Sequence, residues 1–451
     1  MIRPLSLSAL AQRFGGTLLR PDATFSAVST DSRSPLPDSV FVALRGERFD
    51  GHDFLDTAAA QSVGLVVETP AKHLAVPQWV VPDSTVALGQ IGLLVREQFE
   101  GPVIAITGSS GKTSVKEMAT AILGRLGPTL ATRGNLNNHI GVPMTLFDLS
   151  PSHRFAVIEM GASGPGEIAY LCSIARPTIA MVNNVMPAHL EGFGSVERIA
   201  STKGEIYASL PAEGVAVINL DESWISTWRG QVSCPTVVGY SLRDAAADYR
   251  AGSVHADADG VRFHLATPAG EADIRLPLPG RHNVANALAA AACAMAAGAD
   301  LKAVVEGLSG LTAVKGRMQT LAGCRGSRVI DDTYNANPGS VKAAIDVLVA
   351  RPGRRVLVLG DMAELGASAA LMHREVGEYA MSHGVDELWV CGRFSRSYQS
   401  GFGSGAHVYD SREALAAALK AQLDADACVL VKGSRSAGME QVVHLLMGDE
   451  T

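Results

Sequence analysis

The sequence predicts an α/β protein of three domains, and three observations support this fold class. The chain has 451 residues, more than one ordinary hydrophobic core can organise. Apolar, β-branched runs alternate with helix-length segments after the N-terminal region, the pattern of open parallel sheets. Residues 247–276 instead alternate apolar and polar side chains, which predicts a small antiparallel insertion. We expect domains over residues 1–83, 84–312 and 313–451.

The first 83 residues predict a small α/β module. A helix is expected over 6–14, followed by strands over 39–44 and 63–68 that are separated by Pro and Gly. An amphipathic helix over 84–100 then leads into Gly101-Pro102, where a new series of strands begins.

The central domain is predicted to be a doubly wound sheet of the phosphate-loop type. Buried parallel strands are expected over 103–107, 155–159, 178–183 and 215–219, with a helix over 112–125. We expect the domain to close with an Ala-rich helix that begins near Asn283 and ends at Gly298.

The last part of the chain predicts a Rossmann-like domain. Helices fit between each pair of strands, as at 338–349 and 370–382. The expected strands cover residues 328–332, 355–360, 387–392 and 427–432.

Composition excludes several classes of protein. Hydrophobic residues make up 47% and charged residues 18%, which indicates a globular enzyme, and the net charge of -7 argues against a nucleic-acid binder. The six cysteines form no CxxC pair, so we expect buried thiols in a reducing compartment rather than disulfides or zinc. No apolar run is long enough for a signal peptide or a membrane span, and we expect a cytoplasmic protein.

A phosphate-binding loop is predicted between the strand over 103–107 and the helix that follows it. The segment reads TGSSGKTS, in which glycines let the backbone approach phosphate oxygens at the start of a helix. Lys112 would reach the β- and γ-phosphates and Thr113 would bind Mg²⁺. The strict GxxxxGK[ST] motif fails because Ile106 replaces its first glycine, and a Gly/Ser-rich turn with an exposed lysine is the alternative. The predicted ATP-binding residues of the loop are Gly108, Ser109, Ser110, Gly111, Lys112, Thr113 and Ser114.

The shorter TGxxGKT form resembles the superfamily of Mur ligases and folylpolyglutamate synthetases, and the resemblance covers essentially the whole chain. It implies an ATP-dependent ligase that joins a carboxylate to an amine. In that chemistry the carboxylate attacks the γ-phosphate to give an acyl-phosphate, and the amine then displaces phosphate through a tetrahedral intermediate. Magnesium and basic side chains must neutralise the negative charge that gathers in such a site.

The resemblance assigns metal ligands and makes Lys112, His189 and Lys203 catalytic. Glu159 ends a predicted strand and His189 follows another, so both are expected at the carboxyl edge of the sheet. With Thr113 they look like the magnesium ligands of the family. The alternative is that Glu159 caps a turn and His189 is an ordinary loop histidine.

Lys203 matches a lysine that the family carries in carbamylated form. Reaction with CO₂ turns the cation into an anion that can bind a metal. A solvated lysine that faces Glu197 or Glu205 on its own helix is the alternative.

The resemblance also extends the nucleotide site beyond the loop. Asn286 would reach the adenine, whereas Asn283 fits either the same site or a helix N-cap. Arg317 and Asp332 match positions that hold the phosphates and the ribose, and domain closure would bring them to ATP.

Two polar segments of the N-terminal module narrow the family. They resemble the uridine-binding module of Mur ligases that add a third peptide residue or D-alanyl-D-alanine, although such segments also form ordinary turns. Folylpolyglutamate synthetases lack this module, which leaves them as a distant alternative. Asn137 and Asn138, within GNLNNHIGVP, look like a segment that faces the substrate diphosphate. The other expected UDP-substrate contacts are Ser29, Thr30, Asp31, Ser32, Arg33, Asp50, Gly51 and His52.

The C-terminal segments resemble the Mur ligases that add D-alanyl-D-alanine. The Asp-Asn-Pro-Arg motif of diaminopimelate-adding enzymes is absent, and NANP stands in that loop, while GDMAELG and KGSRSAGME fit the dipeptide adders. Tyr334, Asn335 and Asn337 are the expected D-Ala-D-Ala region. The resemblance therefore implies addition of D-alanyl-D-alanine to UDP-N-acetylmuramoyl-tripeptide, with release of ADP and phosphate, by a monomer in peptidoglycan precursor synthesis.

Three alternatives remain open on the sequence. The chain could be another Mur-type ligase, a phosphate-loop kinase or nucleotide switch, or a non-catalytic UDP-sugar-binding protein. No NKxD guanine motif is present, which disfavours a GTP switch. Nothing in the sequence distinguishes diaminopimelate from lysine as the third residue of the acceptor peptide.

Overall fold

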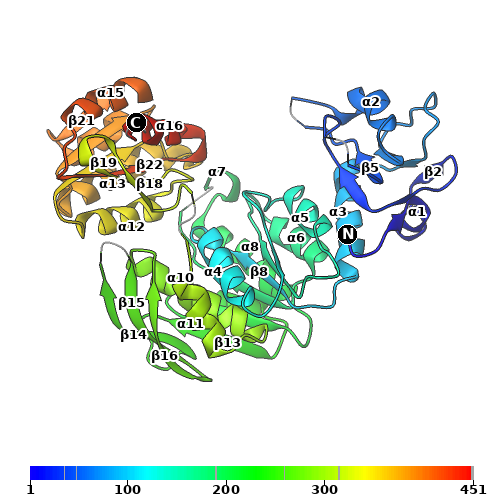
Figure 1. The fold of residues 1–451 in the computed structure, drawn as a ribbon, viewed down its shortest axis with the longest axis horizontal. Helices are drawn as coiled ribbons and strands as arrows, with labels where there is room; N and C mark the ends of the chain where they lie inside the picture. The colour runs from blue at the N-terminus through cyan, green and yellow to red at the C-terminus, as the bar shows by residue number, and fades with distance from the viewer. Residues whose placement is uncertain (35, 47, 188–189, 258–259, 313–314, 448–451) are drawn as a thin grey trace.

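The molecule consists of three lobes in chain order. The computed structural model describes residues 1–34, 36–46, 48–187, 190–257, 260–312 and 315–447. Figure 1 shows the N-terminal and C-terminal lobes on opposite sides of the central one. Each lobe is built on its own sheet with helices packed against it, so the predicted α/β class with three domains is confirmed.

The N-terminal lobe has a sheet of short strands. Helix α1 (Leu7–Phe14) begins where the Ser6 side chain accepts the N–H of Ala9, and α2 (Leu55–Ala59) covers the other end of the lobe. Both predicted strands are present, but the other three strands of the sheet, each of three residues, were not predicted because their hydrophobic patterns are too short. The sheet order is β2 (Thr17–Leu19), β7 (Gln78–Val80), β6 (Gly64–Val67), β5 (Ser39–Val42) and β4 (Ala27–Ser29).

Helix α3 (Ser84–Glu97) joins the first two lobes. The Asp83 side chain accepts the N–H groups of Thr85 and Val86 and thereby fixes its start. One continuous hydrophobic cluster runs from the N-terminal sheet through α3 into the central lobe. At the end of α3, Glu97 pairs with Arg13 of α1 at 2.6 Å and with Arg176 of the central lobe at 2.8 Å.

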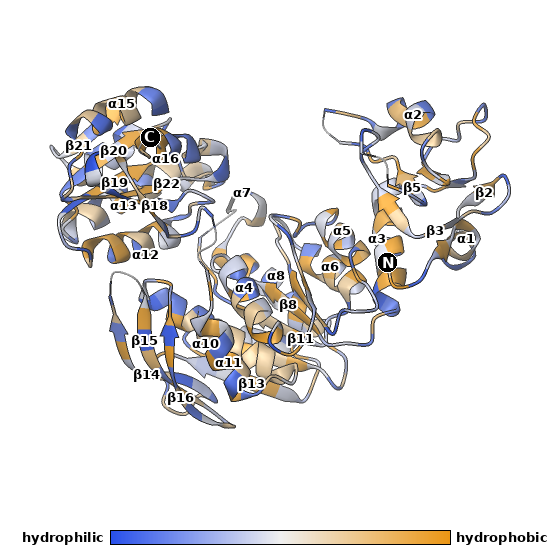
Figure 2. Ribbon diagram, in the orientation of Figure 1, coloured by the Kyte–Doolittle hydropathy of each residue, from blue (hydrophilic) through white to orange (hydrophobic). Residues whose placement is uncertain are grey.

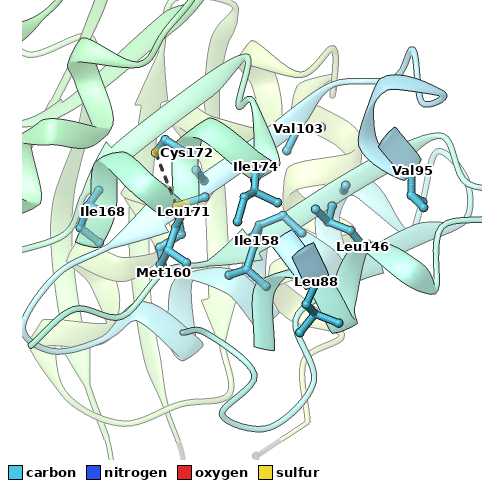
Figure 3. Packing of buried hydrophobic residues seen from close by; sticks show 14 of the residues in the cluster. Leu88, Val95, Val103, Leu146, Ile158, Met160, Ile168, Leu171, Cys172 and Ile174 are labelled. Carbon is cyan, nitrogen blue, oxygen red and sulfur yellow. Dashed lines mark hydrogen bonds between the residues drawn. The ribbon is translucent and has the colours of Figure 1, made fainter. Parts of the chain in front are cut away.

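Figure 3 shows how α3 packs on the central lobe. Leu88 and Val95 of α3 lie with Leu146 of α5 (Gly141–Phe147) and Ile174 of α6 (Glu167–Ala175) against one face of the sheet. Burial of such side chains contributes roughly 1.5–3 kcal/mol each. Figure 2 shows hydrophobic residues along α3 and the inner strands, and hydrophilic residues on loops and outer helix faces.

The central sheet is doubly wound with an antiparallel edge, as predicted. The strands from β8 to β13 pair in parallel, whereas β14, β15 and β16 pair with one another antiparallel. The order is β16 (Gly270–Leu276), β15 (Val261–Thr267), β14 (Tyr249–Ala256), β13 (Thr236–Ser241), β12 (Val215–Asn219), β11 (Ile179–Val182), β8 (Val103–Thr107), β10 (Phe155–Glu159) and β9 (Thr129–Ala131).

Helices cover both faces of the central sheet. One face packs against α5, α6 and α8 (Val196–Ala208), and the other packs against α4 (Lys112–Leu123) and α10 (Arg281–Ala296). The expectation that the helix ending near Gly298 closes the domain was wrong. A further helix, α11 (Leu301–Ser309), starts at the Asp300 cap and packs against α4, where Gly307 lies so close to Ile122 that a Cβ would meet its Cα at 2.5 Å.

The C-terminal lobe is a Rossmann-like sheet between two layers of helices. Its strand order is β17 (Gln319–Ala322), β18 (Arg328–Asp332), β22 (Ala427–Lys432), β19 (Arg354–Leu359), β20 (Glu387–Cys391) and β21 (Ala406–Tyr409), and only the edge strand β17 pairs antiparallel among the described residues. The covering helices are α12 (Pro338–Val349), α13 (Ala369–Ser382), α14 (Ser395–Phe402), α15 (Arg412–Gln422) and α16 (Glu440–Leu446).

The predicted burial of the cysteines is confirmed. All six cysteines lie in the described residues, where each is buried with a free thiol. Within the same residues, none of the helices combines the length and the hydropathy that a bilayer crossing requires.

Candidate active site at the carboxyl edge of the central sheet

The phosphate loop has the geometry that its sequence predicts. Strand β8 ends at Thr107 and α4 begins at Lys112, so the loop lies at the carboxyl edge of the sheet. Gly108 and Gly111 have φ angles of 149° and 77°, which side chains rarely adopt. No side chain caps α4, so its first N–H groups face outward at the positive end of the helix dipole, as an anion site requires.

Asn184 and Met186, which the sequence analysis did not single out, form hydrogen bonds with the serines of the phosphate loop. The N–H of Ser109 donates to the Asn184 carbonyl at 2.9 Å, and the N–H of Ser110 donates to the Asn184 side chain at 2.8 Å. The Ser109 hydroxyl also exchanges hydrogen bonds with the backbone of Met186. These contacts engage the N–H groups of Ser109 and Ser110 within the protein, whereas Lys112, Thr113 and Ser114 lie in the first turn of α4, where N–H groups have no partner within the helix.

Asparagines enclose Gly111 on its other side. The Asn183 amide donates to the Ser110 carbonyl and to the Asn286 side chain, both at 2.9 Å. Asn286 in turn donates to Asn283 at 3.1 Å, and Asn283 donates to the Pro279 carbonyl. Asn283 is therefore not an N-cap, since α10 begins after Gly280. Asn183 was missed, although it directly follows β11 just as Glu159 ends β10.

We expect Gly111→Ala to weaken nucleotide binding by roughly tenfold or more, a loss comparable to one charge-assisted hydrogen bond. A Cβ at this position would lie 2.4 Å from the Asn183 amide nitrogen and 2.7 Å from the Asn286 oxygen. Calorimetric titration with ADP measures the effect. Gly166→Ala is the matched control, because its φ of 82° is equally strained but nothing lies within 4 Å of the added carbon. Equal ADP affinity of Gly111→Ala and wild type would contradict the prediction.

Glu159 lies at the centre of a buried polar network. One carboxylate oxygen accepts the Thr113 hydroxyl at 2.7 Å and the other accepts the Asn137 amide at 2.8 Å, while the side chain is 2% exposed. Its N–H donates to the hydroxyl of Thr132, another residue at a strand's carboxyl end that the sequence analysis missed. Glu159 does not cap the turn that follows it. A carboxylate beside a threonine hydroxyl is the hard oxygen set that Mg²⁺ prefers.

Lys112 reaches back over the loop and donates to the Gly108 carbonyl at 2.8 Å. Burial lowers the pKa of Lys112, Glu159 opposes that shift and Arg317 adds to it. The lysine thus contacts the loop that it was predicted to serve and lies within electrostatic reach of the proposed metal ligand.

Lys203 is not the solvated lysine of the alternative. It extends from α8 into the interior, is 2% exposed and lies 5.8 Å from the centre of the Phe193 ring. Burial, together with the nearby positive charge of Lys112, lowers the pKa of Lys203 to about 7. Glu205, one of the two partners named in that alternative, instead accepts the N–H groups of Gly166 and Ala169. His189 lies outside the described residues.

The C-terminal lobe contacts the phosphate loop directly. Arg317 donates to the Thr113 hydroxyl at 2.7 Å and stacks on the Tyr334 ring at 4.0 Å. Asn337, which caps α12, places its amide 3.5 Å from the Ser109 carbonyl. Three of the residues predicted in this lobe therefore lie at the seam with the central lobe.

Asp332 lies at the end of β18 beside a partner that was not predicted as a site residue. Its carboxylate accepts the Lys432 ammonium at 2.5 Å and the N–H of Met318 at 3.2 Å. Asn335 follows in the same loop, and its carbonyl accepts Lys432 at 2.8 Å. Lys432 therefore binds both Asp332, which was predicted to contact the nucleotide, and Asn335, which was predicted in the D-Ala-D-Ala region.

The segment of residues 29–33 in the N-terminal lobe forms a turn after β4. The Asp31 carboxylate accepts the backbone and guanidinium of Arg33, and these bonds lower the pKa of Asp31 to about 2. The Ser29 hydroxyl bonds with the Asp31 backbone, and Thr30 and Ser32 are half-buried in the same turn. The guanidinium of Arg33 is largely exposed.

The second predicted segment of this lobe holds a histidine in a fixed tautomer. His52 shares a hydrogen bond of 2.7 Å with Asp50 through Nδ1, while its Nε2 accepts the N–H of Glu68 at 3.0 Å. Arg45 pairs with Glu68 at 3.0 Å, a contact that the sequence did not predict. Gly51 lies against the strand backbone, where a Cβ would meet Ala43 Cα at 2.9 Å.

The Asn-rich segment of residues 135–143 contacts both the central network and the N-terminal lobe. Asn137 binds Glu159, as described above, whereas Asn138 accepts the N–H groups of Ile140 and Gly141 and fixes the start of α5. Helix α5 packs against β4, the strand that leads into the turn of residues 29–33. The segment therefore runs from the phosphate loop toward the N-terminal lobe.

Fold and site together define a nucleotide-dependent enzyme in which a phosphate loop, a buried carboxylate and an arginine from a second sheet meet. Comparison with known families agrees. The family descriptions "Mur ligase family, catalytic domain", "Mur ligase middle domain" and "Mur ligase, glutamate ligase domain" match residues 24–95, 106–294 and 316–435. The chain belongs to the Mur ligase family.

Individual relatives match over nearly the whole chain. The UDP-N-acetylmuramoyl-tripeptide--D-alanyl-D-alanine ligase of Escherichia coli K12 is 46% identical over 449 residues, which cover 99% of each chain. A crystal structure of MurF from Acinetobacter baumannii superposes with a TM-score of 0.93 at 36% identity and covers 99% of both chains. MurF ligase from Thermotoga maritima in complex with ADP superposes with a TM-score of 0.84 at 28% identity and covers 93% of this chain and 96% of that one.

Proposed function

We propose that this protein adds D-alanyl-D-alanine to UDP-N-acetylmuramoyl-tripeptide in the cytoplasm, with hydrolysis of ATP to ADP and phosphate, during peptidoglycan precursor synthesis. The observation that carries the proposal is the junction at Thr113, where Glu159 of the central sheet and Arg317 of the C-terminal lobe meet on the phosphate loop. Relatives named for this reaction share the chain's full length, which supports the choice of substrates.

The three lobes support a division of the ligands. We place the uridine nucleotide on residues 1–83, ATP on 84–312, and the dipeptide together with the closing contacts to ATP on 313–451. The polar turns of the N-terminal lobe lie at one end of the molecule and the lobe that carries Arg317 lies at the other (Figure 1). The Asn-rich segment between them would carry the acceptor carboxylate toward the phosphate loop.

We propose that the reaction proceeds in two steps. An oxygen of the acceptor carboxylate attacks the γ-phosphorus and ADP leaves. The amine nitrogen attacks the carbonyl carbon of the acyl-phosphate, loses a proton, and phosphate leaves as the C–O bond breaks. Lys112 binds the Gly108 carbonyl and Arg317 binds the Thr113 hydroxyl, so both cationic side chains lie on the loop, where they would neutralise the phosphates. Asn286, behind Gly111, would face the adenine.

The buried oxygen set fits Mg²⁺. We propose Thr113, Glu159 and His189 as ligands, together with Lys203 in carbamylated form. Magnesium would supply charge neutralisation at the phosphates. Support comes from the carboxylate of Glu159, which is aimed at the Thr113 hydroxyl, and from Lys203, whose buried amine has a pKa near neutrality, where the neutral form that reacts with CO₂ is well populated.

We place the dipeptide near Tyr334, Asn335 and Asn337. These residues lie between β18 and α12, on the side of the C-terminal lobe that contacts the phosphate loop. We propose a monomer as the active form.

Amide formation in the presence of ATP and Mg²⁺ tests the proposal. We expect ADP and phosphate release to require both UDP-N-acetylmuramoyl-tripeptide and D-alanyl-D-alanine, with the pentapeptide product detected by mass spectrometry. ADP release without either substrate would instead indicate a nucleotide switch. Product formation with a single amino acid but not with the dipeptide would indicate another Mur-type ligase.

Parallel assays with the diaminopimelate and lysine forms of the tripeptide identify the acceptor. Binding of the UDP precursor without turnover of ATP by the folded protein would overturn the ligase assignment in favour of a non-catalytic UDP-sugar-binding protein.

A further inference from the structure

A fully buried ammonium lies at the carboxyl edge of the C-terminal sheet. Lys432 is the last residue of β22, which runs between β18 and β19, and it is 4% exposed. In an open parallel sheet, ligands bind outside the carboxyl ends of the strands. The ammonium therefore sits beneath the surface that faces the phosphate loop.

Lys432 binds two different parts of the proposed site. Its Nζ donates to the Asp332 carboxylate at 2.5 Å and lies 3.4 Å from the Asp332 carbonyl, while it donates to the Asn335 carbonyl at 2.8 Å. The other oxygen of Asp332 accepts the N–H of Met318, next to Arg317. One cation thus fixes the nucleotide carboxylate and the loop that begins the dipeptide region.

Stability alone is a poor explanation for this arrangement. A buried ion pair loses hydration that its Coulomb attraction only partly restores, and apolar replacements are often neutral or stabilising. An ion pair with a structural role is present at the opposite edge of the same sheet, where Arg354 at the start of β19 meets Glu387 at 2.7 Å. That pair contacts no residue of the proposed site.

We infer that Lys432 is a positioning residue that sets the Asp332 carboxylate for the nucleotide and the Asn335 loop for the amine substrate at the same time. The inference rests on the proposed function and adds a residue to it. Its consequence is selective: loss of the ammonium should weaken the nucleotide and the dipeptide but leave the UDP precursor, which binds to the other lobes, unaffected.

Three variants separate these effects. Asp332→Asn removes the carboxylate charge but keeps the lysine on Asn335, so ADP affinity should fall while the KM for the dipeptide stays near that of wild type. Asp332→Asn with Lys432→Met leaves no unpaired buried charge and should raise the KM for the dipeptide about tenfold, the effect of one hydrogen bond to a charged group. Lys432→Met alone should show both defects. The KM for the UDP precursor should stay within about twofold in every variant, a change too small to count as a lost contact.

The control is Arg354→Met with Glu387→Gln, which removes the ion pair at the opposite edge. It should lower the melting temperature without a selective change in any KM. The inference is overturned if the double variant at 332 and 432 has the wild-type KM for the dipeptide, or if its KM for the UDP precursor rises as much as its KM for the dipeptide. Wild-type amide formation in the same assay shows separately whether the proposed function holds.

Discussion

Lys112→Ala is expected to reduce amide formation about a thousandfold, the effect of removing a preorganised charge from a transition state. Lys112 is the first residue of α4 and bends back over the phosphate loop, where it contacts the Gly108 carbonyl. In the variant, Arg317 would be the cationic side chain among the described residues that still contacts the loop during transfer of the γ-phosphoryl group. The binding of the UDP precursor should be unchanged, because its proposed contacts lie in the N-terminal lobe and the Asn-rich segment.

Product formation under single-turnover conditions and calorimetry with the UDP precursor measure the two halves of this prediction. Lys302→Ala is the control, since this lysine on α11 is exposed and pairs only loosely with Glu306, at 3.9 Å. A folded Lys112→Ala protein that no longer binds the precursor would contradict the division of ligands between lobes. Retention of full activity would contradict the role of the loop.

The long elements of the fold were predictable because they are buried on both faces. Strands β8, β10 and β12 match their predicted limits, since a continuous β-branched run bounded by polar residues shows where a buried strand begins and ends. The short strand β9 and the partners in the N-terminal sheet were missed, because strands of three residues carry no periodic signal.

Helix α11 shows a different limit of prediction from the sequence. Its helical pattern follows the Gly298 stop after two residues, and no helix was predicted there, although the expected central domain extended to residue 312. Asp300, which accepts the N–H of Ala303 as the cap of a new helix, was the signal available. The packing of α11 against α4 shows that this helix is part of the central lobe.

Candidate site residues with recognisable chemistry could be predicted from motifs, whereas residues that hold their neighbours in place could not. Glu159 and Lys203 were singled out from motifs, and the structure buries both near the loop. Asn183, Asn184 and Lys432 were missed, although each stands at the end of a parallel strand. Asparagine and lysine at such positions commonly serve as caps or solvated side chains, and only the three-dimensional contacts reveal what they hold.

Lys203→Ala is expected to lower amide formation about a hundredfold, the upper range for losing a group that tunes a metal site. The side chain fills a buried place beside Phe193, and no replacement in the variant would carry the negative charge of a carbamate. Small carboxylates such as formate and acetate could enter the space that the deletion creates and supply an anion in its place. We therefore expect partial recovery of activity that rises with carboxylate concentration.

The same carboxylates should give no recovery in Lys112→Ala, because that variant lacks a cation rather than an anion. This contrast matters, since a general effect of salt on folding or on substrate binding would restore both variants alike. Labelled bicarbonate provides an independent readout, because wild type should show a carbamate carbon signal by NMR that Lys203→Ala lacks. Absence of both the signal and the recovery would mean that Lys203 acts as an unmodified amine, whose charge the adjacent Lys112 already disfavours.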